Sequence, residues 1–208
     1  MTELKKSSTN IKTTKKIKEK KIMPNYGMEI NKMQSSYNAA LCRAGVVTGL
    51  AENAKVPNGG LVFADNTTAL PDSIYGTKDL NLENFKQYAA SGNGAAYIID
   101  SADIPEVTDA NGNVYKVGSD VTSLEFSQDK PLRMRKLQPE DRLYIYDGNV
   151  TEAAVVGNYL KPTTNSFFFT KDTIAPVSGL GLVVQAVLPL TAGLMNKGNK
   201  YLCKVVSI

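Results

Sequence analysis

The densest acidic cluster of the sequence lies in its second half and consists of four carboxylates: Glu140, Asp141, Asp147 and Glu152. Two carboxylates held close together can act as a general acid and a general base, or bind a hard cation. However, Pro139 precedes the first pair and the alternating segment 142–146 follows it, which is typical of an exposed turn that enters a strand. We therefore expect these carboxylates to be solvated, and their replacement by amides to change surface charge only.

Histidine is absent from the 208 residues. Its absence excludes Ser-His and Cys-His nucleophile pairs, a histidine general base and histidine metal ligands. The two cysteines, Cys42 and Cys203, each follow a leucine, and we expect both to be buried, reduced thiols. The glycine pairs at 92/94 and 179/181 lack the third glycine and the strand–helix context of a phosphate-binding loop. The sequence therefore predicts a protein that is not an enzyme and that binds no metal or cofactor.

Three of the four arginines lie within ten residues, at positions 133, 135 and 142. In an extended segment Arg133 and Arg135 share one face and could bind an acidic partner surface through bidentate contacts. The favoured interpretation is a salt-bridged surface in which Glu140 and Asp141 supply the carboxylates. Docking of a partner on Arg133 and Arg135 is the alternative.

Three consecutive phenylalanines, Phe167, Phe168 and Phe169, give the clearest indication of a protein partner. In a strand, Phe167 and Phe169 point to one face and Phe168 to the other. If one face is core, the other exposes an aromatic ring unless something covers it. We expect such an exposed ring to anchor a partner, at a cost of about 2 kcal/mol of binding when it is truncated to alanine.

The net charge of +4 is unevenly distributed along the chain. Residues 1–22 carry +6, because they hold two glutamates and eight lysines: Lys5, Lys6, Lys12, Lys15, Lys16, Lys18, Lys20 and Lys21. The other 186 residues hold 16 basic and 18 acidic groups and carry −2. Since residues 1–22 have few large apolar side chains, we expect a disordered or extended basic arm. The near-neutral body argues against a basic nucleic-acid-binding face on the domain itself.

Three interpretations of the arm remain open. In the first, residues 1–22 are a solvated tail without a function. In the second, they are an arm that contacts nucleic acid or an acidic partner surface. In the third, they are translated leader upstream of a start at Met23. In the second case the arm lysines bind the partner. Nucleic acid is expected to contact the chain only through this arm.

The remaining chain, residues 23–208, predicts a mainly β body. Short apolar or alternating segments follow one another every 8–14 residues, with turn signals such as Asn58-Gly59 and Asp147-Gly148 between them. This spacing indicates an antiparallel sandwich or small barrel with one or two short helices. Apolar residues from Leu80 to Ala89 have near-helical spacing and predict one of those helices.

Domain organisation follows from composition. The body is a single unit at 23–208, or is divided near residue 130 into 23–130 and 131–208. No secretory signal is expected, and the most apolar stretch, residues 179–195, is too short and too polar for a membrane span.

The basic arm and the β-rich body together resemble the decoration, or cement, proteins of tailed-bacteriophage heads. The resemblance is one of general character, and its β segments lie in the C-terminal part of the chain: Pro139–Ile145, Val156–Leu160, Gly181–Val187 and Tyr201–Val206. No motif of the family allows a functional residue to be transferred.

The resemblance implies a virion structural protein that binds the major capsid lattice and stabilises the head. Its partner is the major capsid protein or another virion protein, and its copies are homo-oligomeric or lattice-bound. Its location is the virion head, and the host cytoplasm during assembly. The alternatives are a phage tail or tail-tube protein, and a coat protein whose basic arm contacts the genome.

Overall fold

The computed structural model describes residues 25–65, 82–91, 93–101, 106–108, 114–116, 124–127, 130–192 and 195–208. The side chains of 106–108, 114–116, 191–192 and 195–197 are outside this description. The prediction of a mainly β fold is confirmed, because the described residues contain strands, three 3₁₀ turns and no α-helix. No described helix is long and apolar enough to cross a membrane.

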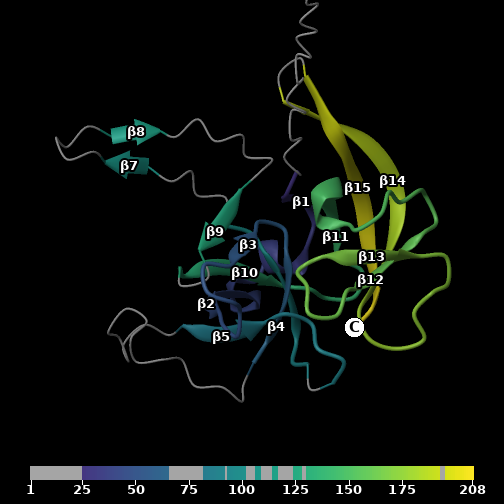
Figure 1. Cartoon of the computed structure of the whole chain (residues 1–208). Helices are drawn as coiled ribbons and strands as arrows, with labels where there is room; N and C mark the ends of the chain where they lie inside the picture. The colour runs from purple at the N-terminus through teal and green to yellow at the C-terminus, as the bar shows by residue number, and fades with distance from the viewer. Residues whose placement is uncertain are drawn as a thin grey trace, which may run out of the picture.

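One half of the molecule is a six-stranded antiparallel sheet (Figure 1). Its order is β1-β11-β15-β14-β12-β13. These strands comprise, in chain order, Met28–Lys32 (β1), Arg142–Tyr146 (β11), Tyr159–Pro162 (β12), Phe169–Asp172 (β13), Gly181–Ala192 (β14) and Met195–Ser207 (β15).

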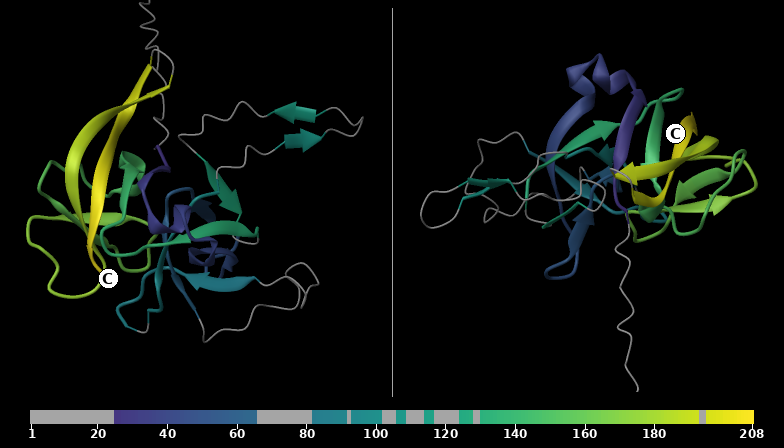
Figure 2. Two further views of the ribbon diagram at one scale, coloured as in Figure 1. Left: turned by 180° about the vertical axis from the view of Figure 1, so that it is seen from behind. Right: turned by 90° about the horizontal axis from the view of Figure 1, so that it is seen from above.

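The other half is a closed five-stranded barrel with the order β10-β2-β5-β4-β6. All its pairs are antiparallel except β2 with β5. The barrel strands are Cys42–Val47 (β2), Leu61–Ala64 (β4), Glu83–Lys86 (β5), Ala96–Ile99 (β6) and Leu132–Lys136 (β10). Barrel and sheet occupy the two halves of the molecule in all views (Figures 1 and 2).

Smaller elements complete the described chain. Two antiparallel pairs lie outside the sheet and the barrel, one formed by Lys55–Pro57 (β3) and Glu125–Ser127 (β9), the other by Glu106–Thr108 (β7) and Val114–Lys116 (β8). The 3₁₀ turns are Gln34–Ser36 (η1), Ala39–Leu41 (η2) and Asp147–Asn149 (η3).

Strands β4 and β6 form a wall that both halves share. All eight of their residues are buried, which is expected of strands that are covered on both faces. One face packs on the sheet in the larger apolar cluster, and the other face fills the barrel in the second cluster. The sheet-facing side chains are Leu61, Phe63, Ala96 and Ile98, and the barrel-facing side chains are Val62, Ala64, Tyr97 and Ile99.

The helix predicted around residues 80–89 is wrong where the structure describes it, since Glu83–Lys86 is a strand. Its apolar residues have helical spacing by coincidence, since they enter different parts of the core. Phe85 lies inside the barrel, edge-on to Tyr97 at 5.0 Å, whereas Tyr88 lies against Phe63 on the sheet side. Residues 80–81 of the predicted helix lie outside the described residues.

The turn dipeptides predict bends correctly but do not join paired strands. Gly59 has a φ of 70°, as expected, yet β3 pairs with β9 and β4 pairs with β5 and β6. Asp147-Gly148 begins the 3₁₀ turn η3. Residues 153–156, although largely apolar, form an irregular loop and no strand.

The strands of the two halves are interleaved along the chain. β1 belongs to the sheet with β11–β15, and β10 closes the barrel with strands that precede it in the sequence. The chain therefore passes between the halves after β1 and again between β10 and β11.

Candidate functional site

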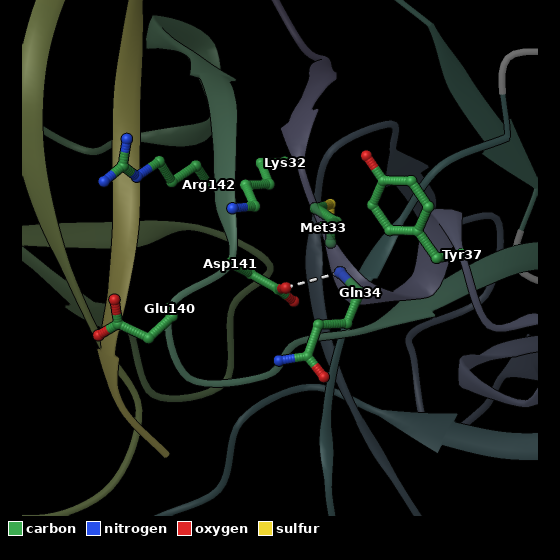
Figure 3. A pocket seen from close by; sticks show the side chains of 7 residues that line it. All are labelled: Lys32, Met33, Gln34, Tyr37, Glu140, Asp141 and Arg142. Atoms are coloured by element: carbon green, nitrogen blue, oxygen red, sulfur yellow. Dashed lines mark hydrogen bonds between the residues drawn. The ribbon is translucent and has the colours of Figure 1, made fainter.

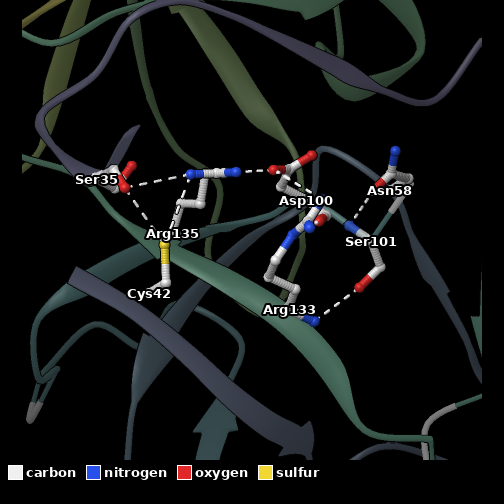
Figure 4. A network of polar contacts seen from close by, with 7 residues as sticks. All are labelled: Ser35, Cys42, Asn58, Asp100, Ser101, Arg133 and Arg135. Atoms are coloured by element: carbon white, nitrogen blue, oxygen red, sulfur yellow. Dashed lines mark hydrogen bonds and ion pairs between the residues drawn. The ribbon is translucent and has the colours of Figure 1, made fainter. Parts of the chain in front are cut away.

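The two arginines predicted to bind a partner lie on one face of β10, as their spacing requires (Figure 4). Both point at Asp100, the residue that follows β6. Arg135 Nε forms an ion pair with the Asp100 carboxylate, and Arg133 Nη2 lies 3.3 Å from the same carboxylate oxygen. Arg133 Nε also donates to the Asp100 backbone oxygen at 2.7 Å.

This network continues through the backbone on both sides. The Ser101 hydroxyl oxygen accepts the Arg133 backbone N–H at 2.7 Å, and the Ser101 N–H donates to Asn58 Oδ1 at 3.1 Å. Arg135 Nη1 donates to the Ser35 backbone oxygen at 3.4 Å. Asp100 therefore ties β10 to β6 and to the segment before β2.

The arginine network corrects the sequence prediction in two respects. The carboxylate partner is Asp100 rather than Glu140 or Asp141. Arg135 is also not a surface residue, because only 13% of its side chain is exposed, against 48% for Arg133. Of the two, Arg133 alone retains accessible surface for a partner.

Replacement of Arg135 by alanine is expected to lower the free energy of unfolding by about 3 kcal/mol, because it leaves the buried Asp100 carboxylate without its closest cation. The matched change Arg133→Ala should cost at most about 1 kcal/mol, since that side chain is half exposed. Urea denaturation of both variants measures the difference. Equal losses in the two variants would contradict the structural role given to Arg135.

The phenylalanine triplet is part of the core and does not form the exposed anchor that was expected. Phe169 is buried in the larger cluster and Phe167 in the barrel cluster, so the segment joins the two halves. The Leu61 N–H donates to the Phe167 backbone oxygen at 2.8 Å, which fixes the segment to β4. Phe168 is half-buried and stacks on Tyr26 with ring centroids 5.8 Å apart.

The acidic residues of the predicted cluster do not lie together in one solvated turn. Glu140 is exposed and pairs with Lys204 at 2.7 Å, and Glu152 pairs with Lys171 at 3.2 Å. Asp141 is buried, which contradicts the expected solvated turn. The residues of this turn do not form a carboxylate pair for acid–base chemistry. In the described part of the chain, no three Cys, Asp or Glu side chains are placed to hold a metal ion.

Asp141 holds the turn before β11 against the segment after β1. Its Oδ1 accepts the Gln34 N–H and its Oδ2 accepts the Gln138 N–H, both at 2.8 Å. Burial raises the pKa of this carboxyl above its ordinary value, and the two N–H donors oppose that rise only in part. The residue lines a cleft of about 340 Å³ between β1, η1 and the turn (Figure 3).

Replacement of Asp141 by asparagine is expected to destabilise the protein by about 1–3 kcal/mol, because the amide has one acceptor for two buried N–H donors. Glu140→Gln is the control, since its ion pair is exposed and should change stability by less than about 1 kcal/mol. Thermal and urea unfolding of both variants give the comparison. A neutral Asp141→Asn would restore the solvated-turn interpretation.

Strands β14 and β15 form a ribbon that extends past their sheet (Figure 1). They pair with each other from Gly181↔Ser207 to Ala192↔Met195. In contrast, β12 pairs with β14 only at Leu182 and Val183, and β11 pairs with β15 only from Lys200 to Lys204. Among the described strands, the outer part of the ribbon has no neighbour on either edge.

Asp147 joins the base of this ribbon to the start of the described chain. Its Oδ2 accepts the Asn199 N–H at 2.8 Å, and its Oδ1 accepts from the Asn25 side-chain amide at 3.3 Å. The Gly148 N–H donates to the Asn25 backbone oxygen at 2.9 Å. Gly198 has a φ of 127°, and a Cβ there would clash with Asp147. Residue 25, which follows the basic arm, is thus fixed beside the base of the ribbon.

The remaining predicted residues are the lysines of the arm and the two cysteines. The eight arm lysines lie outside the described residues, so their proposed contacts stay a prediction. Both cysteines are free, as predicted. Cys203 is buried, which raises the pKa of its thiol, whereas Cys42 is only half-buried and the prediction of its burial is wrong. The ribbon was recognised in the sequence only as two strands, because no local signal reports where neighbouring strands end.

Comparison of the chain with protein-family models, with curated proteins and with solved structures gave no match.

Proposed function

We propose that this protein is a structural component of a tailed-bacteriophage head, which binds the major capsid lattice and stabilises it without catalysing a reaction. The observation that carries the proposal is the β14–β15 ribbon, a long projecting element whose base lies beside the start of the body. A lattice-binding protein needs a fixed shape and elements that reach beyond its own core.

The body supplies the fixed shape. Because β4 and β6 are covered on both faces, the barrel and the sheet cannot separate without exposing the core of each. Bending at the junction between the halves is opposed in the same way. The base of the ribbon, from Lys200 to Lys204 of β15, is in the centre of this sheet between β11 and β14. The base of the ribbon is therefore fixed rigidly in the sheet.

The ribbon is suited to contact through its faces. Pro189 lies in β14 and has no N–H to offer an added strand, which limits strand addition at that position. Leu188 is partly exposed on the ribbon. Interfaces of this kind are held mainly by apolar and hydrogen-bonded contact, in line with the body's net charge of only −2.

The basic arm adds a second, electrostatic contact. Residues 1–22 carry +6 and join the body through residue 25, beside the ribbon base. An arm that leaves the body at this place can bind the same neighbouring subunit as the ribbon. Linked contacts of this kind raise the overall affinity because the second contact is intramolecular.

Heads of the encoding phage, prepared with this gene deleted, provide the test. The full chain should co-sediment with them and appear as added density on the outside of the shell by cryo-electron microscopy. A variant without residues 2–22 should melt like the full chain and bind the heads more weakly. Its loss of affinity relative to the full chain should be larger at 50 mM than at 500 mM salt, because salt screens the arm's charges. A variant with all eight arm lysines changed to glutamine separates charge from length.

Two outcomes would contradict a place in the head, and a third would contradict the role given to the ribbon. Density on the tail, or closed rings of the purified protein, would favour a tail or tail-tube protein. Closed shells formed by the chain alone would favour a coat protein. Complete release of the full chain at moderate salt would show that the arm, and not the body, is the main attachment.

A further inference from the structure

The cleft beside Asp141 has an unusual charge arrangement. It is lined by Lys32, Met33, Gln34, Tyr37, Glu140, Asp141 and Arg142, which come from β1, η1 and the turn that enters β11 (Figure 3). The pairing register places Lys32 directly opposite Arg142, and Arg142 directly opposite Lys204. Three cations thus lie in a row across three neighbouring strands.

Like charges that face each other across a strand pair destabilise a sheet. Lys204 is compensated, because its Nζ lies 2.7 Å from Glu140 Oε2. Lys32 and Arg142 are exposed, and neither makes an ion pair with any described residue. The row therefore contains two adjacent cations whose mutual repulsion the described chain leaves uncompensated.

The acidic groups of the cleft cannot compensate them. Glu140 is occupied by Lys204, and both oxygens of Asp141 accept backbone N–H groups. The charged groups that remain free to bind a ligand are therefore both cations, namely the Lys32 ammonium and the Arg142 guanidinium. An arginine at such a position can hold a carboxylate with two parallel hydrogen bonds.

An aromatic side chain forms the other side of the cleft. Tyr37 caps η1 through its own N–H, which donates to the Gln34 backbone oxygen at 3.0 Å. The residue is 84% exposed, the second largest exposure among the described large apolar residues. Figure 3 shows Tyr37 on the side of the cleft opposite Arg142 and Glu140. Tyrosine and arginine are the residue types most often found as anchors of protein interfaces.

We infer that this cleft is a docking site for an acidic segment of a partner protein, in which Lys32 and Arg142 bind a carboxylate and Tyr37 packs on the adjoining apolar side chain. The inference deepens the proposed function and rests on it only for the identity of the partner. A protein carboxylate fits better than a row of nucleic-acid phosphates, because the cleft offers only two free cations and Glu140 beside them repels further negative charge.

The test uses the full chain, labelled with ¹⁵N, and the probe peptide acetyl-Ala-Glu-Leu-Glu-Ala-amide. Because the basic arm can also attract this peptide, binding is followed at the amides of Gln34, Tyr37 and Arg142. These signals should shift and saturate at millimolar peptide. The peptide with glutamine in place of both glutamates should bind at least tenfold more weakly.

Lys32→Glu separates binding from stability. It should weaken peptide binding at the cleft at least tenfold and, because an opposite charge then faces Arg142, raise the melting temperature by about 1–3 °C. Lys130→Glu makes the same charge change at another exposed lysine and should do neither.

The inference is overturned if the cleft amides show no saturable shift with the peptide, or if Lys32→Glu fails to raise the melting temperature. It is also overturned, in favour of nucleic acid, if a thymidine oligonucleotide shifts the same amides and displaces the peptide. None of these results changes the outcome of the head-binding experiment, so failure of the inference and failure of the proposed function can be told apart.

Discussion

The double burial of β4 and β6 is the constraint on which the rest of the structure depends. Each strand has only four residues, and each alternates between the sheet and the barrel, so no side chain of the wall is free to face water. Polar groups around the wall are satisfied accordingly. Asp100, directly after β6, forms ion pairs with two arginines of β10. Phe167 and Phe169 place one ring in each half.

The elements that we propose as binding sites lie around this wall and not in it. The β14–β15 ribbon, the root of the basic arm and the Lys32–Arg142 cleft all belong to the sheet half, on strands that the wall supports from one side. Asp147 contacts both residue 25, which follows the basic arm, and the base of the ribbon. Asp141 lines the cleft. In each case an aspartate accepts a hydrogen bond from a distant segment, from the Asn25 side-chain amide and the Asn199 N–H at Asp147 and from the Gln34 N–H at Asp141.

The sequence predicts the fold class because short alternating segments and turn dipeptides are local signals. It predicts β11 and the core of β14 and β15 correctly for this reason. It fails at β5, where residues that enter two different clusters happen to have helical spacing. The burial of Asp141 depends on a donor, Gln34, that lies 107 residues away, and the Lys32–Arg142 juxtaposition depends on the β1–β11 register. Neither is encoded in a local pattern.

A wall shared by the barrel and the sheet requires the two halves to unfold as one unit. Native-state hydrogen exchange at rising denaturant measures this directly, through the backbone amides of β6 in the wall and of β11 and β15 in the sheet. We predict that the exchange free energies of these amides converge on a single value, that of global unfolding. Exchange of the β11 and β15 amides through a separate opening of lower free energy, while β6 stays protected, would contradict the account.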